Sequence, residues 1–304
     1  MKRVLNDGRR PTRQQGAHSP SVQPFLKWPG GKRWLVPELL KIIEEHEYVT
    51  YREPFLGGGA LFFALRPKRS VLSDINSDLI NTYRQVKNRA STLLEQLRPL
   101  PINQVTYDGL RECCPKSPLQ RAVRFLYLNR TAFGGMYRLN KLGEFNVPFG
   151  GGERTTAPLW QYDLITSSAR ALRGAKLLTV DFEVALSDAR KGDLVYCDPT
   201  YTVAHNNNGF IRYNERNFSW EDQKRLSRSC HSAAGRGALV IVSNAYHREV
   251  LDLFAPPQHI AVARSSRLCP DVTHRRSVDE YLFVFPPREG DKAKRHDRGR
   301  VHEK

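Results

Sequence analysis

The chain has 304 residues, of which 40% are hydrophobic and 10% aromatic, as in a globular protein with a full core. It holds no apolar run long enough to span a bilayer, and no apolar core follows its basic start, so the sequence argues against a membrane protein and against a secretory signal. Its five cysteines form no CxxC pair, which argues against a zinc site and a disulfide framework and favours a cytoplasmic location.

The net charge of +17 is concentrated in particular stretches of the chain. Residues 84–176 hold 15 Lys and Arg against 6 Asp and Glu, and both ends are basic, whereas residues 21–83 and 177–287 are nearly neutral. Such a distribution is expected if the middle of the chain binds a polyanion. A solvated basic surface is the alternative, and charge alone does not separate DNA from RNA.

Strand and helix patterns alternate between two polar ends. In chain order, the first part predicts a strand at 49–55, a helix at 60–65, a strand at 69–74 and a helix at 79–87. The later part predicts strands at 177–182, 193–199, 237–244 and 278–285, with a helix at 220–233. Apolar strands that alternate with helices indicate an α/β fold with a mostly parallel sheet covered on both faces, which binds ligands beyond the carboxyl ends of its strands.

Three of these strands end on acidic residues. The first runs into EPFLGGG (53–59), the second ends at Asp74, and the third carries Asp181 and Phe182. Glycines let the backbone approach a ligand closely, a carboxylate one βα unit later can accept ribose hydroxyls, and a ring can pack on adenine. Any tight turn can use glycines, but the second acid favours a nucleoside pocket. Because the loop lacks the Lys-Ser/Thr of phosphate-binding loops, we expect an adenosyl cofactor rather than ATP.

The strand LVYC (194–197) runs into Asp198-Pro199-Thr200-Tyr201. Taken alone, Asp-Pro at a strand end can be an ordinary turn. In company with four other segments it is more specific: FLKWPGGKRWLVPEL (25–39), EPFLGGGALFF (53–63), LSDINSDLINTYRQVK (72–87) and FLYLNRTAFGGMYRLNKLGEFNVPFG (125–150). Taken in chain order, with the tetrapeptide last, these five segments lie between about residues 24 and 285. They resemble the motifs of the Dam-type (alpha-group) DNA adenine-N6 methyltransferases, whose usual catalytic tetrapeptide is Asp-Pro-Pro-Tyr.

The resemblance implies a Rossmann-like, S-adenosylmethionine-dependent methyltransferase sheet with an inserted, mainly helical target-recognition region. We expect the catalytic domain at 24–88 and 177–285, the DNA-binding insertion at 89–176, and flexible basic tails at 1–23 and 286–304. The expected cofactor is S-adenosyl-L-methionine.

The resemblance and the strand ends together give the expected site residues. The cofactor-binding residues are expected to be Trp28, Lys32, Glu53, Phe55, Gly57, Gly59, Asp74, Ile75, Asp181, Phe182 and Asp198. The DNA-binding residues are expected to be Asn129, Arg130, Arg138 and Asn140. The catalytic residues are expected to be Asp198, Pro199 and Tyr201.

The chemistry of the reaction explains the catalytic residue types. The exocyclic amine of adenine is a poor nucleophile because its lone pair is delocalised into the ring. Two acceptors for its hydrogens, the Asp198 carboxylate and the Pro199 carbonyl, favour a pyramidal nitrogen aimed at the methyl group. Tyr201 can stack on a base turned out of the duplex. No metal and no covalent nucleophile are needed.

The expected function is therefore methyl transfer to adenine N6 in double-stranded DNA, by a monomer or weak dimer with no metal and no membrane partner. An RNA adenine methyltransferase is one alternative, although segment 125–150 suits the accessible major groove of DNA. A catalytically inactive DNA-binding relative is another, against which the intact Asp198, Pro199 and Tyr201 argue.

Overall fold

The computed structural model describes residues 23–140, 142–151, 160–202, 218–265 and 277–287; both expected tails lie almost wholly outside these ranges. The strands are β1 (Thr50–Glu53), β2 (Ser70–Asp74), β3 (Ala175–Thr179), β4 (Asp193–Cys197), β5 (Leu239–Ala245), β6 (Gln258–Ser265) and β7 (Ser277–Phe285). The α-helices are α1 (Val36–Glu44), α2 (Ala60–Leu65), α3 (Ser77–Leu97), α4 (Gln104–Glu112), α5 (Pro118–Thr131), α7 (Tyr162–Ala171), α8 (Phe182–Leu186), α10 (Trp220–Gly235) and α11 (Arg248–Phe254). Short 3-10 turns are η1 (Phe133–Gly135) and η2 (Leu172–Gly174).

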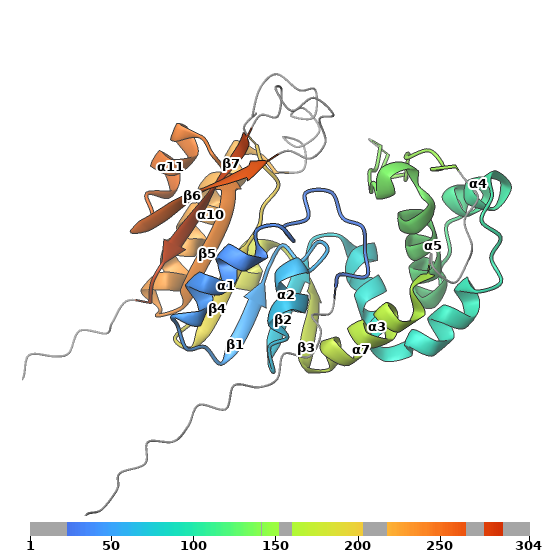
Figure 1. Ribbon diagram of the computed structural model, residues 1–304, viewed down its shortest axis with the longest axis horizontal. Coiled ribbons are helices and arrows are strands. Elements are labelled where there is room, and N and C mark those ends of the chain that lie inside the picture. Colours follow the sequence, from blue (N-terminus) through green and yellow to red (C-terminus); the bar gives the residue numbers. More distant parts are fainter. Residues whose placement is uncertain (1–22, 141, 152–159, 203–217, 266–276, 288–304) are drawn as a thin grey trace, which may run out of the picture.

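The seven strands form one sheet in the order β3-β2-β1-β4-β5-β7-β6 (Figure 1). The five strands from β3 to β5 are parallel, and β7 is antiparallel to both of its neighbours. The predicted Rossmann-like α/β sheet is thereby confirmed. Because β7 runs in reverse, the start of β7 lies at the edge where the parallel strands end, with Glu280 opposite Ala245 of β5.

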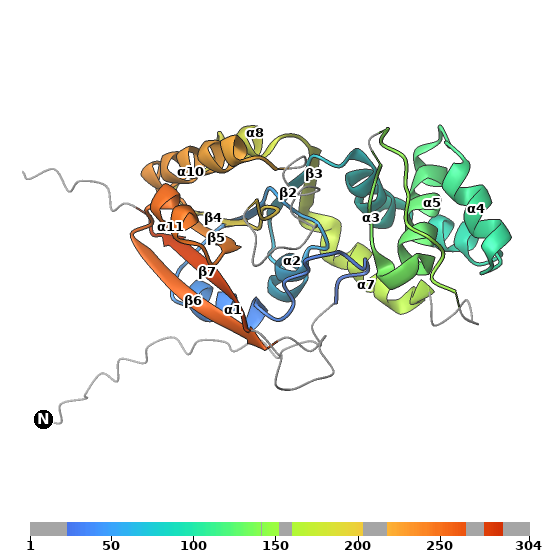
Figure 2. The ribbon, with the colours of Figure 1, turned by 90° about the horizontal axis from the view of Figure 1, so that it is seen from above.

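Helices cover both faces of this sheet (Figure 2). Side chains alternate along each strand: Leu194 and Tyr196 of β4 join the core under α1 and α2, whereas Val195 and Cys197 join the core under α8 and α10. Strands β5 and β7 alternate in the same way. This burial on two faces explains why the strands appear as continuous apolar runs in the sequence.

Local sequence signals set most element boundaries. Helix α3 starts where the Asn76 side chain accepts from the Leu79 amide at 3.0 Å, and α10 starts at a capping box of Ser219 and Asp222. The predicted helix at 60–65 is confirmed at both ends. The predicted strand 177–182 is wrong at its end, because β3 stops at Thr179 and Asp181 instead caps α8. Helix α11 and strand β6 were not predicted.

Helix α3 joins the sheet to the helical insertion. The predicted border between residues 88 and 89 falls inside this 21-residue helix, at a kink where Arg89 has φ −142° and ψ 37°. Helix α3 contacts β2 and β3 of the sheet as well as α5 and α7 of the insertion (Figure 1). The insertion is thus attached through a shared helix rather than through a flexible linker.

After α5 the chain folds back on itself between residues 132 and 149. Two antiparallel bridges, Ala132 with Phe149 and Leu139 with Phe145, hold this segment, which we call the 132–149 hairpin. Its buried side chains, among them Phe145 and Val147, anchor it to α4 and α5. The tip around Leu142 is exposed.

Candidate active site

The glycine segment and the Asp-Pro-Thr-Tyr tetrapeptide follow two neighbouring strands of the sheet. Strands β1 and β4 are adjacent, and the connections from them lead to opposite sides of the sheet. In open α/β sheets such a switch point is where ligands bind. The glycine segment 54–59 follows β1 and the tetrapeptide 198–201 follows β4, so the structure brings both to this point.

The glycine loop passes directly under the Trp28 ring. Gly57 has φ +46°, and a Cβ at this position would lie 2.8 Å from two atoms of the Trp28 indole. The indole also stacks on Tyr137 of the 132–149 hairpin, with ring centroids 5.4 Å apart. Glycine is required here both by the backbone angle and by the tryptophan. Trp28 therefore connects the loop of β1 with the insertion.

The carboxylate of Asp74 holds the same loop from the next strand. Its Oδ2 accepts from the Gly57 amide at 3.1 Å, and its Oδ1 accepts from the Asn76 amide at 2.9 Å. Burial raises the pKa of Asp74 above its ordinary value, although these backbone donors act in the opposite direction. The adjacent Ile75 side chain is 72% exposed, so an apolar surface stands beside the acid at the strand end.

Glu53 ends β1 in a buried position. It is 2% exposed, and its Oε2 has no hydrogen-bond partner among the described residues. Burial raises the pKa of Glu53 well above its ordinary value, with the charges of Asp198 and Asp74 acting in the same direction. A buried carboxyl oxygen without a partner is unfavourable, and a bound ligand with a donor group would relieve it.

One carboxylate oxygen of Asp198, Oδ1, has two partners. Ser243 Oγ donates to Oδ1 at 2.7 Å, and Lys32 Nζ lies 3.5 Å from the same atom. Because the single hydroxyl hydrogen of Ser243 goes to Asp198, the Tyr196 hydroxyl, 3.0 Å away, donates to Ser243. Among the described residues none donates to Oδ2 of Asp198. Burial raises the pKa of Asp198 to about 6, although Lys32 and Ser243 lower it.

Lys32 is a buried cation at the centre of this site. Its ammonium donates to both oxygens of Glu280, at 2.9 and 3.0 Å, and to the Tyr201 hydroxyl. It also lies 4.3 Å from the centroid of the Tyr201 ring. The structure therefore brings Lys32, Asp198 and Tyr201 together, and adds Glu280. The sequence signal for Glu280, an acid inside an apolar strand, was present but was not used.

The tetrapeptide is anchored after its last residue. Thr202 Oγ1 accepts from Gln223 Nε2 at 2.8 Å, and Gln223 Oε1 accepts from Asn244 Nδ2 at 3.0 Å. All three residues are buried. The Pro199 carbonyl accepts no hydrogen bond from any described residue. These buried amides, which sequence reasoning missed, fix the chain beside Pro199.

The residues that follow β3, Asp181 and Phe182, were expected to bind the cofactor, but they make contacts within the protein. Asp181 Oδ1 accepts from the Glu183 amide and from Arg225, each at 2.9 Å. The Phe182 ring is stacked on Phe55 with centroids 5.3 Å apart. A ligand ring placed between two such rings would need about 7 Å, so the Phe55 and Phe182 rings contact each other rather than enclose an adenine. Phe182 is 6% exposed, and the Arg225 guanidinium lies 4.8 Å from the centroid of its ring.

Two of the four expected DNA contacts need correction. The Asn129 side chain is fully buried and forms two hydrogen bonds with the backbone of Lys27, at 2.6 and 3.0 Å. Arg130 is 5% exposed and donates to Gln161 and to the Phe25 carbonyl. Burial lowers the pKa of Arg130 to about 10. Both side chains tie α5 to residues 25–27 and are buried, so the expectation that they contact DNA is wrong.

The other two expected contacts lie on the 132–149 hairpin. Arg138 is exposed, and its guanidinium donates to the Asn146 side chain at 2.8 Å. Asn140 Oδ1 accepts from the amides of Leu142 and Glu144, which shapes the hairpin tip. Arg138 is available to an outside partner, whereas Asn140 serves the turn.

Sequence reasoning missed an aromatic ring on the same hairpin. Phe133 is 59% exposed, in an otherwise buried stretch at the end of α5. Exposed aromatic rings on nucleic-acid-binding surfaces stack on bases or wedge between them. The signal was an aromatic residue immediately before the glycine pair at 134 and 135.

Part of the positive charge of residues 84–176 is used inside the molecule. Arg84 and Lys87 donate to carbonyls of β3, and Arg124 donates to carbonyls at the end of α4. Arg121 pairs with Asp78 of α3. The net charge of this segment therefore overstates the charge that it presents to a polyanion.

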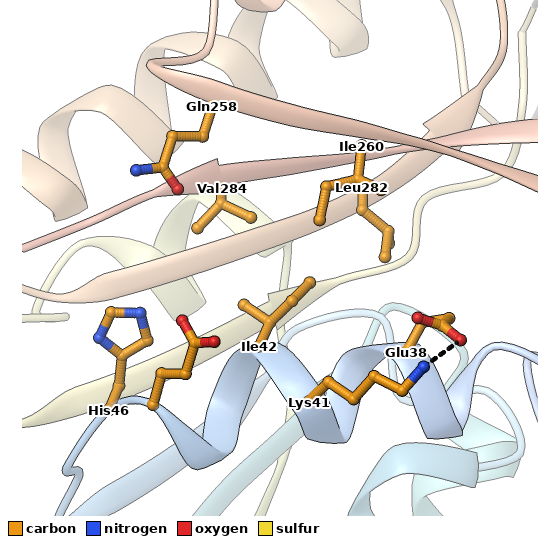
Figure 3. Close-up of a pocket in the computed structure, with 9 residues that line it drawn as sticks. Glu38, Lys41, Ile42, His46, Gln258, Ile260, Leu282 and Val284 are labelled. Atoms are coloured by element: carbon orange, nitrogen blue, oxygen red, sulfur yellow. Dashed lines mark hydrogen bonds and ion pairs between the residues drawn. The ribbon is translucent and has the colours of Figure 1, made fainter.

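The cavities that the structure describes lie away from the predicted site. One, of about 260 Å³, lies between α1 and the strands β6 and β7 (Figure 3). Its lining shares no residue with the predicted site: Glu38, Lys41, Ile42, Glu45, His46, Gln258, Ile260, Leu282 and Val284. Within the described ranges we find no cluster of three or more metal-ligating side chains and no helix that could span a membrane.

Comparison with known proteins agrees with this geometry. The family model of the D12 class N6 adenine-specific DNA methyltransferases matches residues 28–265. A type II methyltransferase of Lactococcus lactis subsp. cremoris is 37% identical over 236 residues, covering 74% of this chain and 81% of the relative. A DNA adenine methylase of Salmonella typhi is 34% identical over 273 residues, covering 86% and 95%.

A distant structural likeness also exists. The rRNA methyltransferase AviRa of Streptomyces viridochromogenes superposes with a TM-score of 0.39 at 14% identity, covering 89% of this chain and 88% of that one. The family match covers both the loop of β1 and the tetrapeptide after β4. The chain belongs to the D12 class of N6 adenine-specific DNA methyltransferases, and its activity is methylation of adenine in DNA.

Proposed function

We propose that the chain transfers the methyl group of S-adenosylmethionine to the N6 amine of an adenine turned out of the duplex, at the site around Asp198. The observation that carries this proposal is the state of the two predicted acceptors. Asp198 Oδ1 accepts from Ser243 and lies 3.5 Å from the Lys32 ammonium, while Oδ2 and the Pro199 carbonyl accept nothing from the described residues. Two rigid acceptors on consecutive residues suit the two hydrogens of one amine.

The residues at the ends of β1 and β2 fit the proposed cofactor. Asp74 suits the ribose hydroxyls, and the exposed Ile75 offers an apolar surface to the adenine. The unpartnered Oε2 of Glu53 suits an ammonium donor. When bound, S-adenosylmethionine supplies an electrophilic methyl group on a sulfonium.

The residues around Asp198 stabilise the positive charge that develops on the adenine amine during methyl transfer. As the N–C bond forms, the methyl–sulfur bond of the sulfonium would break to leave a neutral thioether. The positive charge that grows on the amine nitrogen is stabilised by the ionised Asp198 beside it, and it is lost when one amine hydrogen leaves as a proton. With a pKa of about 6, Asp198 is ionised at neutral pH. Tyr201, whose hydroxyl accepts from Lys32, holds its ring beside the acceptors for stacking on the base.

We assign the contact with DNA to the outer side of the 132–149 hairpin. Arg138 and Phe133 are both exposed there, one suited to phosphates or guanine edges and the other to stacking. The hairpin is joined to the site through Trp28, which stacks on Tyr137 and covers the Gly57 loop. Recognition and catalysis are therefore mechanically linked in this proposal.

Labelled methyl incorporation tests the assignment. Asp198→Ala should reduce transfer from radiolabelled S-adenosylmethionine to duplex DNA more than about a hundredfold, as for loss of a preorganised transition-state contact. The matched control is Asp252→Ala, an acid on the surface of α11 that should keep the wild-type rate. Circular dichroism checks that both variants fold. Transfer by Asp198→Ala at nearly the wild-type rate would refute the site.

A further inference from the structure

The Lys32 ammonium has more acceptors around it than hydrogens to donate. Both Glu280 oxygens lie at 2.9 and 3.0 Å, the Tyr201 hydroxyl accepts a hydrogen bond, and Asp198 Oδ1 is farther away at 3.5 Å. An ammonium has three hydrogens, so Glu280 and Tyr201 use them and Asp198 receives the weakest contact. Lys32 is directed mainly at Glu280.

Glu280 reaches this position only because β7 is antiparallel. It lies opposite Ala245, near the carboxyl end of β5, and is 4% exposed. Lys32, 7% exposed, comes from the segment before α1, which lies 248 residues earlier in the sequence. A charge in such a place is costly unless it is paired, so each of the two residues requires the other.

The pairing affects which atoms remain available to the substrate. Without Glu280, the nearest anion for the buried ammonium is Asp198, and a direct ion pair would occupy the carboxylate that has to accept an amine hydrogen. Lys32 would also move from the Tyr201 hydroxyl, and the ring would lose its anchor. Glu280 thus keeps the cation between two catalytic groups without allowing it to block either.

We propose that Glu280 is a positioning residue of the methyl-transfer reaction: its two-oxygen ion pair with Lys32 draws the ammonium away from Asp198 and fixes Tyr201. This inference rests on the proposed role of Asp198 and extends it to a residue outside the motifs. Glu280 itself need not touch the substrate.

Other ionisable groups also face Asp198, and they determine the direction of a pH effect. They lie on the segment before α1 and on β1, β4 and β7, and in the tetrapeptide: Lys32, Glu53, Tyr196, Cys197, Glu280 and Tyr201. Of these, Glu280 raises the pKa of Asp198 and Lys32 lowers it. Removing the Glu280 charge and letting Lys32 approach therefore both lower the pKa of Asp198.

The test compares Glu280→Gln with the wild type in single-turnover methylation from about pH 5 to about pH 8. Asp198 must be ionised, so the wild-type rate should fall by about tenfold per unit as the pH drops below about 6. Glu280→Gln should be roughly 10- to 100-fold slower at neutral pH. Its acid limb should move to lower pH by about half a unit or more. Glu280→Asp, which restores the charge, should recover most of the rate and the wild-type limb.

A buried ion pair at the other end of the same strands provides the control. Asp193 of β4 accepts from Arg52 at 2.7 Å and is 7% exposed. Asp193→Asn should lose stability, as a broken buried pair does, but should keep the wild-type acid limb. A shift of the limb in Glu280→Gln alone separates positioning from general destabilisation.

The outcomes separate the two proposals. A wild-type rate that does not fall toward pH 5 refutes the role of Asp198 itself. If the acid limb of Glu280→Gln lies at the same pH as that of the wild type, the role of Glu280 is overturned whatever the rate of the variant, and the role of Asp198 is not affected. If Glu280→Gln does not fold, Lys32→Met is compared with the double variant Lys32→Met and Glu280→Met. Equal transfer rates in these two variants support a role of Glu280 that is exercised through Lys32, and a further loss in the double variant overturns it.

Discussion

Thr200 is exposed, and among the described residues it has no hydrogen-bond partner. The more common proline at this position would fix φ and restrict the residue before it. In this chain the neighbouring contacts supply the constraint: Asp198 is held by Ser243, and Thr202 is held by Gln223. The tetrapeptide is therefore fixed from both sides, and its third residue is free to vary.

We expect Thr200→Pro to keep its activity within about tenfold of wild type, because no N–H bond to a described residue is lost. Tyr201→Ala should be more damaging, because it removes a stacking surface of about 1 to 3 kcal/mol for a flipped base and also an acceptor of Lys32. Single-turnover rates on a methylatable duplex provide the comparison. If Thr200→Pro is the slower of the two, the threonine has a role of its own in the site.

At the scale of elements, the segment from α5 into the 132–149 hairpin serves two different purposes. The last turn of α5 points inward, where Asn129 and Arg130 bind the backbone of residues 25–27. A few residues later the chain is on the surface, with Phe133 and Arg138 exposed. Two arginines eight residues apart therefore differ in what they bind, although their sequence context looks equally suited to DNA.

These two arginines provide a matched pair of variants. Arg130→Ala should lower the free energy of unfolding by about 2 kcal/mol or more, because buried carbonyl acceptors lose a charged donor, and should leave the salt dependence of DNA binding unchanged. Arg138→Ala should change stability little and reduce the salt slope by about one unit if it contacts a phosphate, or relax specificity at one base if it reads one.

Denaturant unfolding and DNA titration at several salt concentrations measure both effects. The reverse pattern, with a stable Arg130→Ala that binds DNA less tightly, would restore Arg130 to the DNA interface.

At the scale of the whole molecule, the sheet and the insertion share one apolar core. Leu93, in the half of α3 beyond the kink, belongs to the same buried cluster as Phe125 of α5 and Ile241 of β5. Helix α3 crosses from one part to the other without a linker. We therefore expect the two parts to unfold together, since continuous burial couples them.

Leu93→Ala tests this coupling. The side chain is fully buried, so the truncation should lower the free energy of unfolding by about 2 to 5 kcal/mol. Tryptophan fluorescence and far-UV circular dichroism should report one shared transition at a lower urea midpoint. The exposed Leu142→Ala should leave the midpoint unchanged. Two separate transitions would show that the insertion unfolds by itself.

Local patterns in the sequence were sufficient for much of the fold. Apolar periodicity located helix 60–65 and most of the parallel strands, because burial of a strand on both faces leaves a continuous apolar run. Ordered motifs identified the family and the positions of Asp74 and Asp198. Capping chemistry misled the prediction at Asp181, where an acid after a strand starts a helix instead of extending the strand.

The fold class, the methylation of adenine in DNA and the positions of the central motifs can be predicted from the sequence, because each motif consists of residues close together in the chain. The pairing of Glu280 with Lys32, the anchoring of Thr202 by Gln223, and the burial of Arg130 but not of Arg138 follow from the tertiary structure. Those outcomes depend on the reversal of β7 and on the side of α5 that faces the core. A one-dimensional pattern gives the type of a polar residue, but its partner is set by which distant strand ends at the same edge of the sheet.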